Sequence, residues 1–171
     1  DLAVLNAGTH TPVMAEDLCV EPFRQLMETN YMGAVHGLLG VLKMMRQTGA
    51  GHIAIVSSLA GYRGLPSAAA YGPTKAALIN MCEALRPEIE DLGIKLQLIN
   101  PGFVKTPLTD QNDFDMPFLI SVEKAVDYIV SGLKSNRFEI AFPGRFAILM
   151  KLLRILPASL FFAVTRRMLK S

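Results

Sequence analysis

The stretch Ile53-Ala54-Ile55-Val56-Ser57-Ser58, followed by Tyr71-Gly72-Pro73-Thr74-Lys75, decides the fold of this 171-residue chain. Four apolar residues in a row predict a short buried strand, and the two serines follow at its carboxyl end. Tyr71 and Lys75 are four positions apart, so they share one face of a helix. A phenol beside an ammonium group should ionise below its usual pKa of roughly 10, which suits acid/base chemistry near neutral pH.

Three further segments predict strands. Residues 2–5 are apolar and end at Asn6-Ala7-Gly8, whose small residues let another group approach the backbone. Residues 94–99 form a third apolar run, which ends at Asn100-Pro101-Gly102. Residues 138–142 predict a short fourth strand.

Helical periodicity fills the intervals between these strands. Residues 20–47 predict one long helix or two abutting helices, with Asn30 inside. A second helix is expected over residues 69–92, where Pro87 should kink the helix or cut it short. A third is expected from the N-cap Ser121 to about residue 133 or 135.

Strands that alternate with long helices predict an α/β fold, with parallel crossovers and a doubly wound sheet covered on both faces. In such sheets ligands bind beyond the carboxyl ends of the strands. Asn6, Ser58 and the segment 101–106 all follow strands directly, so we expect them to lie at one edge of the sheet. This shared position predicts a binding site there.

The composition narrows the function classes. The chain is 51% apolar and only 19% charged, which excludes a disordered chain or one that coats nucleic acid. Cys19 and Cys82 are interpreted as reduced core residues of a cytosolic protein, and no metal-ligand spacing occurs. His10, His36 and His52 are scattered, and we interpret all three as structural or solvent-facing.

The segment 143–171 differs from the preceding residues 1–142. It carries six basic residues and no acidic one, so with a total charge of +2 the part before it carries −4. Its longest uncharged run, residues 155–165, is too short to span a bilayer. Two interpretations stay open for this basic apolar helix: it lies on an anionic membrane surface, or it packs on the body and covers a substrate cleft.

Together these motifs resemble the short-chain dehydrogenase/reductases in order and spacing. The residues that carry the resemblance are Asn6-Ala7-Gly8, Asn30, Ser58, Tyr71-x-x-x-Lys75 and Pro101-Gly102-Phe103-Val104-Lys105-Thr106. The resemblance implies a Rossmann-like fold and an oxidoreductase that interconverts a secondary alcohol and a ketone with NAD or NADP.

The resemblance also implies a role for each site residue. Tyr71 would be the catalytic acid/base, and Lys75 would lower its pKa and bind the nicotinamide ribose. Ser58, rather than Ser57, would hold the substrate oxygen. Asn30 would kink its helix and order a water that links Lys75 to solvent.

Cofactor contacts follow in the same way. By resemblance, Asn6, Ala7 and Gly8 would lie along the cofactor, and Asn6 would also tie adjacent strands together. Pro101 and Gly102 would border the nicotinamide, with Val104 and Thr106 near its carboxamide.

The sequence departs from the family pattern at two places. Leu5 stands where an asparagine is usual, and the glycine-rich turn for the pyrophosphate is absent, together with the residue that selects NAD or NADP. The chain opens without Met on a strand that resembles an interior one, so we expect the C-terminal two-thirds of the fold. Coenzyme choice and the activity of this chain by itself stay open.

The remaining expectations concern partners. The irregular segment 106–120 is expected to be a flap, and its apolar residues (Phe114, Met116, Phe118, Leu119) indicate a hydrophobic substrate. The resemblance implies a homo-oligomer formed through the two long helices, and a cytoplasmic protein, peripheral on a membrane if the tail docks there. The alternative is a non-catalytic Rossmann-like module that dimerises or docks on membranes and binds no dinucleotide.

Overall fold

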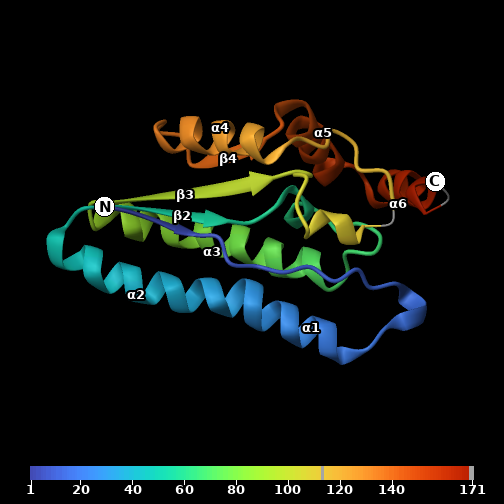
Figure 1. Cartoon of the computed structure of the whole chain (residues 1–171), viewed down its shortest axis with the longest axis horizontal. Helices are drawn as coiled ribbons and strands as arrows, with labels where there is room; N and C mark the ends of the chain where they lie inside the picture. Colours follow the sequence, from blue (N-terminus) through green and yellow to red (C-terminus); the bar gives the residue numbers. More distant parts are fainter. Residues whose placement is uncertain (113, 170–171) are drawn as a thin grey trace.

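A computed structural model describes residues 1–112 and 114–169. Four parallel strands form one sheet in the order β1-β2-β3-β4: β1 (Leu2–Leu5), β2 (Gly51–Val56), β3 (Ile94–Pro101) and β4 (Glu139–Phe142). Each strand predicted from an apolar run is present. The carboxyl ends of all four strands therefore point to the same edge of the sheet (Figure 1).

The first helical region consists of three parts. α1 (Val20–Leu26) and α2 (Gly33–Thr48) are joined by the π-helical segment η2 (Met27–Met32), which contains the buried Asn30. α2 ends at Gly49, whose φ of 63° is in the left-handed region that glycine tolerates. The sequence left one helix or two abutting helices open, and the structure shows two helices joined without a loop.

The other predicted helices form with small differences in their ends. α3 (Tyr71–Asp91) continues for four residues beyond Pro87, so this proline does not end the helix. α4 (Val122–Leu133) begins after Ser121, whose Oγ accepts a hydrogen bond from the Lys124 N–H at 3.3 Å. Short helical turns complete the chain: η1 (Ala15–Asp17), η3 (Leu59–Gly61) and η4 (Thr109–Gln111).

Helices cover both faces of the sheet. α2 and α3 lie beneath it in Figure 1, whereas α4 lies above it. The strands follow one another in sequence order, so each crossover steps in the same direction across the sheet. Because α4 is on the face opposite α3, the β3-α4-β4 crossover has the opposite hand to the crossovers before it, an unusual feature of parallel sheets.

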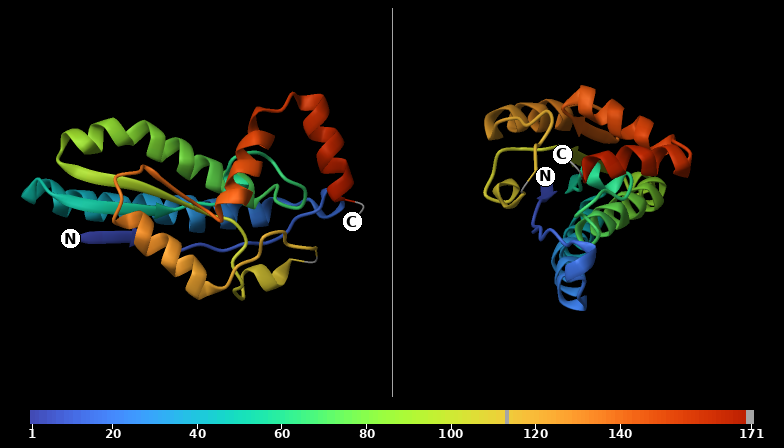
Figure 2. Two further views of the ribbon diagram at one scale, coloured as in Figure 1. Left: turned by 90° about the horizontal axis from the view of Figure 1, so that it is seen from above. Right: turned by 90° about the vertical axis from the view of Figure 1, so that its right-hand side faces the viewer.

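The basic tail forms two helices, α5 (Gly144–Ile155) and α6 (Ala158–Met168), where the sequence predicted one. The break has a local cause. Pro157 disfavours helical geometry in the residue before it, and Leu156 is extended, with φ −62° and ψ 140°. α5 and α6 form a hairpin at one end of the molecule (Figure 2).

The tail is continuous with the main core. Four side chains of α5 are buried against α3 and the sheet: Phe146, Ala147, Met150 and Leu153. No helix in the described part of the chain is long and apolar enough to cross a membrane.

Two sequence expectations about burial need correction. Cys82 is fully buried, but Cys19 is exposed at the N-cap of α1, where the chain is still extended and contributes nothing to the core. Leu2 and Val4 of β1 are 51% and 43% exposed, since β1 is an edge strand of the described sheet.

Candidate active site

The two serines after β2 have different surroundings. Ser57 is buried, its N–H donates to the Ile99 carbonyl at 2.8 Å, and its Oγ donates to the Lys75 carbonyl at 2.8 Å. Ser57 therefore ties the end of β2 to β3 and α3. Ser58 Oγ accepts from the Ala60 N–H at 3.1 Å and donates to the Pro101 carbonyl at 3.4 Å, and it is near enough to the Tyr71 hydroxyl to lower the pKa of the phenol. Ser58 is the serine that meets the phenol.

Lys75 is almost completely buried and points back toward the sheet. Its Nζ donates to the Val56 carbonyl at 3.2 Å and lies 5.6 Å from the centroid of the Tyr71 ring. Burial lowers the pKa of Lys75 to about 8. The two side chains share a face of α3, as the spacing predicts, without a hydrogen bond from the ammonium to the phenol among the described contacts.

The acidity of Tyr71 differs from the sequence expectation. Burial raises the pKa of Tyr71 to about 12, and the hydrogen bond with Ser58 offsets only part of this rise. Lys75 is not among the groups that lower this pKa, and its ammonium is directed at the Val56 carbonyl. Near neutral pH the phenol is therefore a proton donor.

Asn30 holds the turn after β1 in place. Its side chain is fully buried: Oδ1 accepts from the Thr9 N–H at 2.7 Å, while Nδ2 donates to the Thr9 carbonyl at 2.9 Å and to Thr74 Oγ1 at 3.2 Å. π-Helical segments occur frequently at functional sites, and this one places Asn30 against both the turn and α3.

Gly8 brings Asn30 and Lys75 close together. A Cβ atom at Gly8 would lie 3.3 Å from Asn30 Oδ1 and 3.4 Å from Lys75 Nζ. A side chain at this position would crowd both polar groups. Asn6, Ala7 and Gly8 are exposed, so their backbone is open to a ligand along this edge.

The predicted cofactor residues after β3 are held by the neighbouring elements. The Gly102 N–H donates to the Phe142 carbonyl at 2.7 Å, and a Cβ there would lie 2.6 Å from the Phe146 ring. Val104 pairs with Ile120 in a parallel bridge, which closes the base of the flap. The Thr106 N–H donates to Thr109 Oγ1 at 3.0 Å.

His10 is a site residue that the sequence did not single out. We interpreted it as structural or solvent-facing, but its ring meets Tyr71 edge to face, with 4.7 Å between centroids and 71° between planes. The only signal in the sequence was its position two residues after Gly8, in the turn that follows β1.

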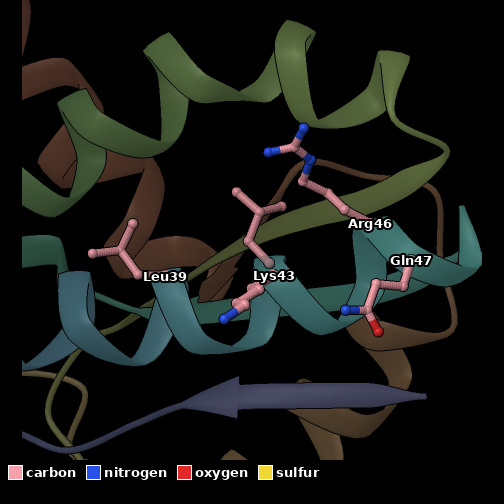
Figure 3. A pocket seen from close by; sticks show the side chains of 5 residues that line it. Leu39, Lys43, Arg46 and Gln47 are labelled. Carbon is pink, nitrogen blue, oxygen red and sulfur yellow. The ribbon is translucent and has the colours of Figure 1, made fainter.

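One surface hollow lies apart from these residues. It measures about 610 Å³ and is lined by Leu39, Leu42, Lys43, Arg46 and Gln47, all on α2 (Figure 3). Within residues 1–112 and 114–169, no group of three or more His, Cys, Asp or Glu side chains is arranged to hold a metal ion.

Known proteins are similar to this chain in sequence and in fold. Residues 1–116 match the short chain dehydrogenase family. An uncharacterized oxidoreductase from Myxococcus xanthus is 40% identical over 168 residues, which are 98% of this chain and 66% of that relative.

Two solved structures extend the comparison. A short chain dehydrogenase from Burkholderia cenocepacia in complex with NADP matches with a TM-score of 0.83 at 26% identity, over 98% of this chain and 70% of that protein. A short chain dehydrogenase/reductase from Burkholderia phymatum in complex with NAD matches with a TM-score of 0.78 over 88% of this chain and 64% of that one; at 20% identity it shows the fold alone.

Proposed function

The chain belongs to the short-chain dehydrogenase family, and from this membership we propose an oxidoreductase that interconverts a secondary alcohol and a ketone with NAD or NADP. The observation that carries the proposal is that Tyr71 has Ser58 beside its hydroxyl and the buried Lys75 Nζ 5.6 Å from its ring centroid. The chain spans 66% of its Myxococcus relative, so we propose the activity for a protein whose cofactor-binding half is complete.

The residues at the sheet edge fit a dinucleotide. Gly8 and Gly102 stand where a side chain would crowd Lys75 or Phe146, and the backbone of residues 6–8 is exposed. We propose that Asn6, Ala7, Gly8 and Lys75 hold the cofactor, together with Pro101, Gly102, Val104 and Thr106. The nicotinamide would supply the hydride, and the protein would supply orientation and the proton.

The proton would come from Tyr71 when a ketone is reduced. Its phenol is protonated near neutral pH, with a pKa of about 12. Ser58, hydrogen-bonded to it, would bind the same substrate oxygen and fix its position. Asn30 would keep the turn after β1 beside Lys75, through the paired hydrogen bonds to Thr9. Positioned acid/base catalysis is worth about 10²–10⁴-fold in rate.

A tyrosine-to-phenylalanine pair tests this proposal. In the full-length protein with NADPH or NADH, Tyr71→Phe should reduce ketone turnover by about 10²-fold or more and leave cofactor binding intact. The matched control is Tyr128→Phe, at a ring that stacks on Phe142 far along the chain in α4. Turnover that survives Tyr71→Phe would refute the role of the phenol.

The alternative is a Rossmann-like module that binds no dinucleotide. The observation in its favour is the exposed apolar surface of α5 and α6, which can dock on a partner without a cofactor. Titration with NADPH and NADH, followed by the fluorescence of the reduced nicotinamide, separates the two proposals. A module without a cofactor would leave that fluorescence unchanged.

A hydrophobic substrate fits the flap. Phe103 packs edge to face on Phe114 and stacks on Phe146, which in turn stacks on Phe118. Phe114 and Phe118 are nonetheless 44% and 45% exposed. We propose that these rings line the entrance to the site for an apolar substrate. The variant Phe118→Ser should bind such a substrate more weakly and show a raised KM.

The exposed side of the α5–α6 hairpin supports peripheral binding to the cytoplasmic surface of a membrane. Ile148, Leu152 and Ile155 are 63%, 53% and 75% exposed on α5, while Leu160 and Phe162 are each 56% exposed on α6. The tail carries no acidic side chain. We propose that the hairpin lies on anionic lipid, where its apolar side chains are buried and its basic side chains are attracted to the negative headgroups.

Vesicle sedimentation tests membrane docking. The protein should bind phosphatidylserine vesicles more strongly than phosphatidylcholine vesicles, and Ile155→Ser with Phe162→Ser should weaken the binding. The matched control is Met44→Ser, at a residue 70% exposed on α2. Equal binding by the tail variant and the control would refute the proposal.

The outer side of α2 is the proposed contact between copies of the chain. Its exposed Leu39 (62%) borders the hollow of Figure 3, where Lys43 and Arg46 give the rim positive charge. Leu39→Arg should convert a dimer to a monomer in sedimentation velocity. An unchanged sedimentation coefficient would place the contact elsewhere.

A further inference from the structure

His10 is in the turn after β1, and its ring lies at the proposed reaction centre, beside Tyr71. The preceding residue, Thr9, is fixed by paired hydrogen bonds with the Asn30 side chain, at 2.7 and 2.9 Å. The His10 ring meets the Tyr71 ring at 4.7 Å between centroids. A residue held this firmly beside the phenol is placed to meet the substrate.

One ring nitrogen of His10 has a partner in the flap. Nε2 lies 3.2 Å from Asn112 Oδ1, and the amide nitrogen of Asn112 lies 3.4 Å from the sulfur of Met116. With its amide nitrogen toward the sulfur, Asn112 presents an acceptor to His10. Nε2 must then carry the ring proton, which leaves a lone pair on Nδ1 of the neutral ring.

The other ring nitrogen has no hydrogen-bond partner among the residues that the structure describes. Nδ1 is buried, without a hydrogen bond to any of the described residues. Burial also lowers the pKa of His10, with the Asn112 hydrogen bond opposing it, so the ring is neutral near pH 7. Buried polar atoms without a partner are rare in folded proteins, and each needs an explanation.

We propose that His10 is a specificity-determining residue, which accepts through Nδ1 a hydrogen bond from a hydroxyl or amine of the substrate next to the reacting carbon. The inference rests on the proposed function, since Tyr71 fixes where that carbon lies. A donor on the neighbouring carbon satisfies the buried acceptor. A substrate without this donor leaves the acceptor unpaired and binds less well in the transition state.

Two polar replacements separate the ring nitrogens. His10→Asn keeps a polar atom near the position of Nδ1 but is too short to make the hydrogen bond with Asn112. His10→Gln is long enough to keep the hydrogen bond with Asn112, but it has no acceptor at the position of Nδ1. His36→Gln, at an exposed position on α2, is the matched control. Thermal unfolding of each variant verifies that it is folded.

The substrates are α-hydroxyacetophenone and α-methoxyacetophenone, which both carry an oxygen beside the carbonyl but differ in the donor. The full-length protein with NADPH or NADH should prefer the hydroxy ketone by about tenfold in kcat/KM. His10→Gln should reduce this ratio to about one, and His10→Asn should keep most of it.

Each contrary result has a distinct meaning. Equal kcat/KM for both ketones in the wild type would overturn the inference and leave the proposed oxidoreductase intact. A preference kept by His10→Gln and lost by His10→Asn would also overturn it, since His10 would then act through Asn112. Turnover of neither ketone by the wild type would count against the proposed function and this inference together.

Discussion

The guanidinium of Arg63 lies over the ring of Phe161, with 3.9 Å from Cζ to the ring centroid. The same side chain donates from Nη1 to the Leu153 and Leu156 carbonyls, each at 2.7 Å, and so caps the end of α5. Arg63 belongs to the loop that follows Ser58. The loop that carries the proposed catalytic serine is therefore fastened to both helices of the tail.

Replacing Arg63 should loosen the tail. Arg63→Met keeps the aliphatic stem but removes the cap and the cation–π contact, which we expect to reduce the free energy of unfolding by about 1–3 kcal/mol. Denaturant unfolding measures the change, and amide hydrogen exchange should quicken in α5 and α6. Arg24→Met, whose side chain is 72% exposed, is the control. Equal stability of both variants would contradict the structural role of Arg63.

The neighbouring serines should differ in their effect on turnover. Ser57→Ala removes the buried hydrogen bond from the hydroxyl to the Lys75 carbonyl and should cost about 0.5–1.5 kcal/mol of unfolding free energy. Ser58→Ala loses the hydrogen bonds with the Ala60 N–H and the Pro101 carbonyl and should cost a similar free energy, but it should also reduce kcat by about 10²-fold, because the hydroxyl lies beside the phenol and the proposed substrate oxygen. Unfolding and steady-state kinetics of both variants measure this difference. Similar loss of kcat in the two would contradict the assignment.

Much of this architecture could be predicted from local sequence. Short, largely apolar segments predicted the four described strands. The order of polar residues after the strands predicted that Ser58 and Pro101 lie at one edge, where a hydrogen bond of 3.4 Å joins them. The pairing of Ser57 with the Lys75 carbonyl could not be predicted, since the sequence alone does not distinguish a structural serine from a catalytic one.

Features that depend on distant residues were missed. The π-helical segment around Asn30 has its partners at Thr9 and Thr74, far along the chain. His10 contacts Tyr71 across 61 positions of sequence. The pKa of Tyr71 rises because of burial, which spacing along a helix does not report. Pro157 did carry a local signal for the break in the tail, and its effect on the preceding residue explains it.

Asn30 should contribute to stability as well as to the site. Asn30→Ala removes a fully buried amide and leaves the Thr9 backbone unpaired, so the free energy of unfolding should fall by about 1–3 kcal/mol. The control is Asn80→Ala, an exposed position of α3. Chemical denaturation compares them, and a loss no larger for Asn30→Ala than for Asn80→Ala would contradict the prediction.

Glu139 should make stability depend on pH. Burial raises its pKa, but hydrogen bonds from Lys151, Tyr62 and Asn100 more than offset this and hold the pKa of Glu139 below its usual value. A carboxyl with a lowered folded-state pKa stabilises the protein above its unfolded value of roughly 4.3, and that stability is lost as the pH falls through the folded value. When the free energy of unfolding is measured with urea at a series of pH values, Glu139→Gln should therefore lose less stability on acidification than the wild type. The control Glu88→Gln, at an exposed position, should behave like the wild type. The same loss of unfolding free energy at low pH in both variants would contradict this prediction.

The two directions of the proposed reaction should respond differently to pH. Reduction needs the protonated phenol, and with a pKa of about 12 Tyr71 stays protonated throughout pH 6–9, so its protonation should not limit the reduction rate there. Oxidation needs the phenolate, whose fraction rises about tenfold per pH unit below the pKa, so the oxidation rate should climb without a plateau. Single-turnover rates in both directions measure this. A plateau of oxidation near pH 7 would contradict this expectation and would place the pKa of the phenol near neutrality once the cofactor is bound, as the family resemblance implies.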